Sequence, residues 1–260
     1  ALSAVFLLLI VLLVAPLAAY LPVPSMAAIL FIVAWSLIDF HHIGEIIRRH
    51  QRERIVLLIT FVGTLVDLEK GIFLGILVSL LFYLHRTSQP SIRELVPLAA
   101  EFDNPRRKFV PVTGDAPSCP QMALLRVEGS IFFGAAEHVQ QHFRNVDESD
   151  PQKKHLLLTS RAIGFVDLAG AELLAKEATR RRKLGGGLYL VGVQPDLCKM
   201  LRRSGQVDTV GEEQIFRHKG DAIQAIYPRL DNEICRTCTA RVFHECHVAL
   251  PDGTPREAGR

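Results

Sequence analysis

The chain has 260 residues, of which 49% are hydrophobic, and a formal net charge of +3. A net charge this small, with much of the arginine next to apolar segments, argues against a basic nucleic-acid-binding surface. The apolar residues are so unevenly distributed that the first third of the chain and the remainder are interpreted separately.

The first third has the composition of membrane-spanning helices. No charged residue occurs from Leu2 to Ile38, and residues 2–19 alone supply the ~18–20 apolar residues that cross a bilayer core. A cleaved secretory signal is not favoured, because no basic start precedes this run and more apolar segments follow. Since the chain opens inside an apolar helix without a methionine, we expect its true beginning to lie upstream. We predict a transmembrane region over residues 1–86, with helices at about 2–20, 24–39, 55–66 and 71–85.

Charged residues interrupt this region twice. The basic segment 41–54 is predicted to lie at the cytoplasmic membrane surface. Residues 67–70 (DLEK) separate the last two apolar runs, and one continuous helix would bury each of three charges at a cost of about 2.5 kcal/mol or more. We therefore predict two helices joined by a turn that is capped and paired within itself. A transport role for Asp67, Glu69 and Lys70 is the alternative.

The remainder of the chain predicts an α/β domain. Residues 87–120 contain six prolines and are predicted to be a linker, with an edge strand around 109–112. Within 121–229, short apolar runs alternate with helical patterns, which indicates helices packed on a mixed, largely parallel sheet. The predicted strands are 122–127, 130–134, 154–159 and 188–193, and the predicted helices are 135–146, 169–183, 195–203 and 221–227.

A turn between strand and helix is the first candidate site. In GFVDLAGAELL, residues 164–174, an apolar run meets Asp167, and a helical pattern follows. Asp167 is predicted to cap the helix by accepting backbone N–H groups, worth about 1 kcal/mol. Gly170 is predicted to allow close packing of strand and helix.

Several segments resemble two families in a fixed order. LLRVEGSIFFGAAEHV, KHLLLTSRAIGFVDLAGAELL, LGGGLYLVGVQPDLCKMLRRSG and EEQIFRHKGDAIQA resemble successive parts of a STAS domain, the fold of anti-sigma factor antagonists. The preceding APLAAYLPVPSMAAILFIVAWSLIDF and ITFVGTLVDLEKGIFLGILVSLLFYLHRTSQP resemble the last membrane helices of SulP anion transporters, which carry a STAS domain after their membrane domain. The resemblance covers residues 1 to about 228.

The resemblance implies a function that is not enzymatic. It implies the C-terminal part of a secondary transporter for sulfate or a related inorganic anion, multi-pass in a plasma or inner membrane. The STAS domain, residues 121–229, would be cytoplasmic and serve regulation, assembly or partner binding. The implied partners are the lipid bilayer, the rest of the membrane domain and a second copy in a homodimer, with no nucleic acid. The half-helices that bind the anion in the family would lie upstream, so no residue here is assigned to the anion, and the chain alone would not transport. A membrane-anchored STAS signalling or scaffold protein is the alternative.

The resemblance also assigns a role to the turn. The corresponding stretch of the anti-sigma antagonists reads Asp-Ser-Ser-Gly, where phosphorylation of a serine changes the partner interface. Leu168 and Ala169 occupy the two serine positions here, so no hydroxyl remains to be phosphorylated. By resemblance to this partner-binding stretch, we predict a helix-start interaction loop made of Asp167, Leu168, Ala169 and Gly170. A phosphate-binding P-loop is not indicated, because the motif is absent.

The tail, residues 230–260, has cysteine spacing typical of metal sites. Its CRTCTARVFHECH segment contains a C-x-x-C pair followed by further candidate ligands. The candidate zinc ligands are Cys235, Cys238, His244, Cys246 and His247. The alternative is free thiols at a flexible end, together with buried or linker cysteines such as Cys119 and Cys198. No other cofactor and no catalytic residue is expected.

Overall fold

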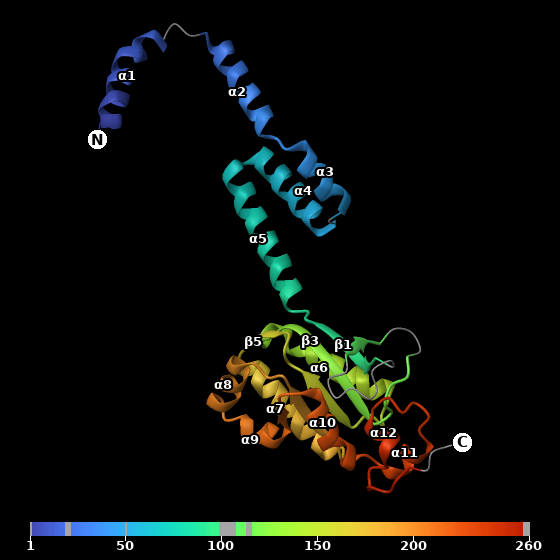
Figure 1. Cartoon of the computed structure of the whole chain (residues 1–260). Coiled ribbons are helices and arrows are strands. Elements are labelled where there is room, and N and C mark those ends of the chain that lie inside the picture. The colour runs from blue at the N-terminus through green and yellow to red at the C-terminus, as the bar shows by residue number, and fades with distance from the viewer. Residues whose placement is uncertain (1, 19–21, 50, 99–107, 113–115, 257–260) are drawn as a thin grey trace. The chain divides into compact units, whose positions relative to one another are not determined.

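The computed structural model describes residues 2–18, 22–49, 51–98, 108–112 and 116–256 (Figure 1). Parts of four predicted regions lie outside the described residues: 19–20 of the first span, 50 of the basic segment, 99–107 and 113–115 of the linker, and 257–260 of the tail. The chain divides into two compact units, Ala1–Leu81 and Phe82–Arg260. Each unit is described by itself.

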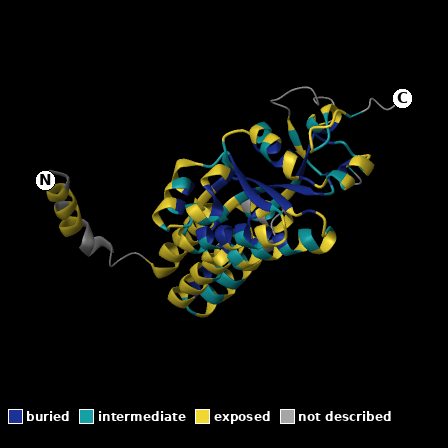
Figure 2. Ribbon diagram, turned by 90° about the horizontal axis from the view of Figure 1, so that it is seen from below, coloured by how far each residue is buried: buried dark blue, intermediate teal, exposed yellow. Residues whose placement is uncertain are grey.

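The first unit is helical. Its elements are α1 (Leu2–Ala18), α2 (Val23–Leu37), α3 (Phe40–Arg49), α4 (Gln51–Val66) and α5 (Leu68–Thr87), the last of which continues into the second unit. Apolar side chains along α1 and α2 are exposed, as the yellow ribbon in Figure 2 shows. Within the described ranges, α5 is the one helix that is both long and apolar enough to cross a membrane, and α2 is a shorter apolar helix. Among the described residues, one helix of sufficient length, α5, therefore falls within the four predicted spans.

The turn between α4 and α5 is capped as the sequence predicts. Asp67 Oδ1 accepts hydrogen bonds from the backbone nitrogens of Glu69 (3.1 Å) and Lys70 (3.2 Å), and Lys70 Nζ lies 3.0 Å from the same carboxylate. The helices approach closely at glycines: a Cβ on Gly71 would stand 2.3 Å from the backbone nitrogen of Thr64. Small residues at such a crossing are typical of helix pairs in membranes.

The second unit is built on one mixed sheet. The strands are β1 (Ser91–Pro97), β2 (Phe109–Pro111), β3 (Met122–Ile131), β4 (His155–Thr159), β5 (Ile163–Val166), β6 (Gly187–Val191) and β7 (Ile215–Phe216). Their order is β2-β1-β3-β4-β6-β7, with β5 paired to β3. The pairs β3–β4, β4–β6, β6–β7 and β3–β5 are parallel, whereas β1 is antiparallel to both β2 and β3.

The strands at the centre are buried on both faces. Because successive side chains of a strand point to opposite sides, each strand contributes to two hydrophobic clusters. In β4, Leu156 and Leu158 pack into one hydrophobic cluster and Leu157 into another. The first cluster is closed by α6 (Phe133–Ser149), α7 (Leu168–Lys183), α8 (Pro195–Arg203) and α9 (Val207–Val210). The second is closed by α10 (Lys219–Ile226) and by the tail helices α11 (Asn232–Thr237) and α12 (Glu245–Val248). Figure 2 shows the sheet as the dark blue centre of this unit.

The structure differs from the sequence prediction at several places, and short elements such as β7 (Ile215–Phe216) and α9 are not among the predicted ones. Strand β1 forms inside the predicted linker, where its polar residues Arg93 and Glu94 obscure the apolar pattern. The predicted strand 122–127 and the start of the predicted strand 130–134 form one strand, β3, which ends at Ile131, whereas residues 133–134 belong to α6. Gly129 has φ 130°, and the register with β5 shifts between Gly129 and Ile131. The described part of the tail, residues 230–256, packs into the second cluster with Phe243 fully buried, and is not the flexible end of the alternative prediction.

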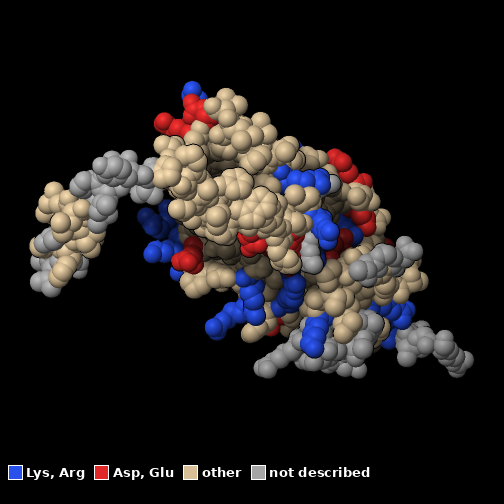
Figure 3. All heavy atoms as spheres, turned by 90° about the horizontal axis from the view of Figure 1, so that it is seen from above, with Lys and Arg blue, Asp and Glu red and all other residues tan. Residues whose placement is uncertain are grey.

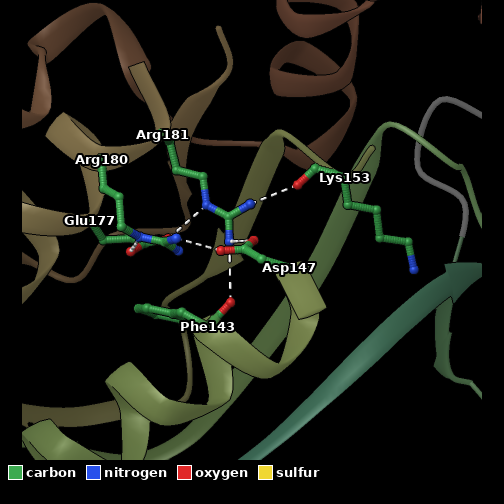
Figure 4. A network of polar contacts seen from close by, with 6 residues as sticks. All are labelled: Phe143, Asp147, Lys153, Glu177, Arg180 and Arg181. Carbon is green, nitrogen blue, oxygen red and sulfur yellow. Dashed lines mark hydrogen bonds and ion pairs between the residues drawn. The ribbon is translucent and has the colours of Figure 1, made fainter. Parts of the chain in front are cut away.

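An ion-pair network fixes α7 against α6 (Figure 4). Arg181 is fully buried, and its Nε donates to Glu177 Oε1 at 2.6 Å while its Nη2 lies 2.6 Å from Asp147 Oδ1. Nη1 of Arg181 donates to the carbonyl of Lys153 at 2.6 Å. Arg180 binds the same two carboxylates, at 2.8 Å to Glu177 and 2.5 Å to Asp147. Two cations and two anions therefore balance, which is the condition for burying charge at low cost.

We predict that Arg181→Met destabilises the second unit by about 3–5 kcal/mol, because Glu177 and Asp147 lose one of their two cations and the network keeps an uncompensated negative charge. Lys183→Met, at an exposed position in the same helical turn, is the control and is expected to cost under about 0.5 kcal/mol. Amide hydrogen exchange of β4 and α7 in the purified chain measures both. Equal exchange rates in the two variants would contradict this role for Arg181.

A buried histidine makes the stability of this unit depend on pH. His155 opens β4, is 4% exposed, and its Nδ1 lies 3.4 Å from the hydroxyl of Tyr189. Burial is the largest cause that lowers the pKa of His155, and the positive charges of Arg229, Arg181 and Lys154 act in the same direction. A backbone hydrogen bond involving Arg229 opposes them, and together these effects bring the pKa to about 4. The folded unit therefore holds this imidazole neutral at pH values where the unfolded chain protonates it.

The unit is accordingly expected to be most stable above pH 6.5, the ordinary pKa of histidine, and to lose stability as the pH falls from 6.5 to about 4. The loss corresponds to about 3 kcal/mol for one group whose pKa is lowered to this extent. Hydrogen exchange at a series of pH values, corrected for intrinsic exchange, measures it. His155→Gln should flatten this part of the profile, whereas His138→Gln, on the exposed side of α6, should leave it in place.

Candidate functional site

The predicted interaction loop lies where β5 ends and α7 begins. Asp167 is the N-cap of α7: its Oδ1 accepts a hydrogen bond from the backbone nitrogen of Gly170 at 2.8 Å, as the sequence predicts. Its Oδ2 accepts a second hydrogen bond, from the backbone nitrogen of Phe133 at 3.0 Å. Asp167 thus joins the starts of α7 and α6, which the sequence does not indicate.

Gly170 allows α7 to approach the sheet. A Cβ at this position would stand 2.2 Å from the carbonyl oxygen of Ile131 and 2.9 Å from a methyl group of Val166. No side chain fits there without moving the helix away from β3. The predicted role of Gly170 in close packing is confirmed.

Three exposed apolar side chains surround this loop. Phe133, Phe165 and Leu168 are 78%, 57% and 54% exposed. The backbone hydrogen bond holds Phe133 beside Asp167, and Phe165 and Leu168 lie within two residues of Asp167 in the sequence. The carboxylate of Asp167 already accepts two backbone hydrogen bonds, so it is not suited to proton transfer. The exposed apolar side chains around it are suited to contact with another protein surface.

The candidate metal ligands of the tail are only partly brought together. Cys235, Cys238 and Cys246 line one small cavity, and Cys119, from the loop before β3, lines it with them. His244 instead lines a different groove, and His247 Nε2 lies 3.0 Å from the carbonyl oxygen of Arg241. As the side chains stand, no three or more His, Cys, Asp or Glu residues in the described ranges form a ready metal site.

Burial keeps the thiols of Cys119, Cys235 and Cys246 protonated. It raises the pKa of Cys119 to about 12 and that of Cys235 to about 11, and the neighbouring cysteines act in the same direction. The pKa of Cys246 is raised for the same principal reason. Without a cation to stabilise the thiolates, these side chains behave as buried apolar groups.

Sequence reasoning missed a second feature, a groove of about 1270 Å³ at the carboxyl ends of β4 and β6. Thr159, Gly192 and Lys219 are among its lining residues. Lys219 Nζ lies 4.3 Å from the ring centroid of Phe109, and burial, followed by the charges of Arg126 and Arg161, lowers the pKa of this lysine to about 8. The groove depends on residues far apart in sequence, so no local motif indicates it.

Comparison with known proteins gives the class of this unit. The family model of the STAS domain matches residues 115–222. The chain is 26% identical over 218 residues to YvdB of Bacillus subtilis, which is named for sulfate transport, covering 82% of this chain and 38% of that protein. It is 23% identical over 239 residues to sulfate transporter 1.2 of Arabidopsis thaliana, covering 87% of this chain and 36% of that protein.

A solved structure shows the same fold. The overall structure of SLC26A9 superposes with a TM-score of 0.62 at 17% identity, over 72% of this chain and 32% of that chain. The second unit is therefore a STAS domain, with its helices packed on a mixed sheet. The chain as a whole is similar to part of these SulP-type and SLC26 proteins, and it spans less than two fifths of the length of the relatives named above.

We predict that Asp167→Ala destabilises the start of α7 by about 1–2 kcal/mol, because both backbone donors lose their acceptor. Asp167→Asn keeps one acceptor oxygen and should retain the cap to Gly170 while weakening the link to Phe133. Amide hydrogen exchange at Gly170 and Phe133 distinguishes the two effects. Unchanged protection of both amides in the alanine variant would contradict the assignment.

Proposed function

We propose that this chain is the C-terminal part of a secondary transporter for sulfate or a related inorganic anion. Its apolar helices complete the membrane domain, and the STAS domain lies in the cytoplasm, where it regulates or assembles the transporter. In this proposal the anion-binding segments belong to a part of the transporter outside this chain, so the chain alone does not transport. Lipid, the rest of the membrane domain and a second copy are the proposed partners.

One observation carries the proposal: exposed apolar helices lead directly into a STAS domain, and relatives named as sulfate transporters match across both parts. Leaving rows of Leu, Ile, Val and Phe side chains in water costs roughly 25 cal/mol per Å² of apolar surface. These helices therefore require lipid or further protein around them. On the face drawn in Figure 3, broad uncharged surface lies between a few groups of charged side chains.

The interaction loop is proposed to dock on the membrane domain of the same transporter. Helix α5 ends at Thr87 and β1 begins at Ser91, so the STAS domain is tethered within a few residues of the helical unit. A tether this short gives the membrane domain a high effective concentration at the STAS surface, which favours it over a partner free in solution. Because Leu168 and Ala169 carry no hydroxyl, phosphorylation at these two positions is not part of the proposal.

The transport proposal is tested by reconstitution. Liposomes containing the 260-residue chain should take up no more labelled sulfate or bicarbonate than protein-free liposomes, whereas the complete product of the gene should take up one of them. If the complete product carries neither anion, the membrane-anchored STAS signalling protein is the better explanation.

The docking proposal predicts that Phe133→Ser with Leu168→Ser slows uptake by the complete transporter about tenfold, the effect of losing about 1.4 kcal/mol of docking free energy. The control is Leu184→Ser, at an exposed apolar position just after α7. Uptake is compared at equal amounts of transporter in the membrane. Equal rates for the double variant and the control would contradict docking through this loop.

A further inference from the structure

Four of the five cysteines of the chain line one cavity, although they lie in three separate segments of the sequence. Cys119 precedes β3, Cys235 and Cys238 lie in and just after α11, and Cys246 lies in α12. The cavity measures about 10 Å³, which is room for about one water-sized particle. All four are free thiols.

The fifth cysteine is a natural control. Cys198 lies in α8, whose Leu197 and Leu201 pack into the hydrophobic cluster on the other face of the sheet. The cysteines are therefore clustered only on the face of the sheet that the tail covers.

Polar contacts that do not involve the thiol protons hold the walls of the cavity. Gln121 clamps the backbone of Asp231: its Oε1 accepts from the Asp231 nitrogen at 2.7 Å, and its Nε2 donates to the Asp231 carbonyl at 3.0 Å. The same Nε2 lies 3.3 Å from Cys235 Sγ. Arg256 donates to the carbonyls of Cys235 and Cys246, the latter at 2.8 Å. The segments that carry the four cysteines are thus fixed around the cavity.

Two arginines line the same cavity and supply positive charge. Arg256 is one, and Arg241 is the other. The buried Nε of Arg241 has no hydrogen-bond partner, and its backbone has φ 38°, a left-handed conformation that costs a non-glycine residue free energy. An unpaired buried donor is also costly. The unpaired donor is explained if the lining carries negative charge when the site is occupied, since a divalent cation held by four thiolates has a net charge of −2.

We propose that Cys119, Cys235, Cys238 and Cys246 form a four-thiolate zinc site that joins the tail to the STAS domain. Zn²⁺ replaces the four thiol protons, which pass to solvent, and no electron is transferred. Four sulfur ligands and a small closed cavity fit the tetrahedral coordination of structural zinc. The thiols must turn about χ1 to reach a common ion, and each cysteine has three staggered positions available for this. His244 and His247 are not ligands in this site.

The experiment measures zinc in the full chain, purified in detergent without chelators. The expected content is about one ion per chain, falling to below about 0.1 when any one of the four cysteines becomes serine. Cys119→Ser decides the matter, because a site confined to the tail would keep its zinc. Cys198→Ser and the double variant His244→Ala with His247→Ala are controls and should keep it.

A labelling measurement on the unmodified chain does not depend on whether the variants fold. Four thiols should resist alkylation until a chelator is added, while Cys198 reacts in either condition at its own rate. Stoichiometric zinc in Cys119→Ser, loss of zinc in the histidine variant, or a chain whose mass shows a disulfide in place of bound zinc would each overturn the proposal. The transport proposal is unaffected by any of these results.

Discussion

The second unit depends on one constraint: its central strands are buried on both faces, so both faces of the sheet must be covered. Leu156 and Leu158 of β4 face one way and Leu157 the other, and β6 alternates in the same manner. The helices α6 to α9 cover the first face. The second is covered by α10 and by the tail, which is why the last described residues are part of the domain and not an appendage.

Each layer is held in place by a small number of buried polar contacts. On the first face, Arg180 and Arg181 share the carboxylates of Glu177 and Asp147, so that α6 and α7 are fixed relative to each other. Because removing one member of such a network strands a buried charge, the network specifies one arrangement of the helices. On the second face, the clamp between Gln121 and Asp231 has the corresponding role for the tail.

The interaction loop takes its shape from the first of these layers. Close approach of α7 to β3 at Gly170 positions Asp167 to accept hydrogen bonds from two helix starts. The carboxylate is used structurally, which leaves the exposed apolar side chains around it as the surface available to a partner. In the proposed docking this loop recognises its partner by shape and apolar contact, and Leu168 and Ala169 offer no hydroxyl for phosphorylation.

The sequence by itself determined the division into an apolar helical third and an α/β remainder, the cap at Asp167, the turn at Asp67 and the close packing at Gly170. These follow from local rules of hydrophobic period, capping chemistry and side-chain size, which act within a few residues. Only the tertiary structure decided that Arg181 is buried at the end of α7, that β1 pairs inside a proline-rich segment, and that Cys119 joins the cysteines of the tail. Each of these depends on which segments the sheet brings together over more than ten residues of separation, and no local pattern in the chain encodes that choice.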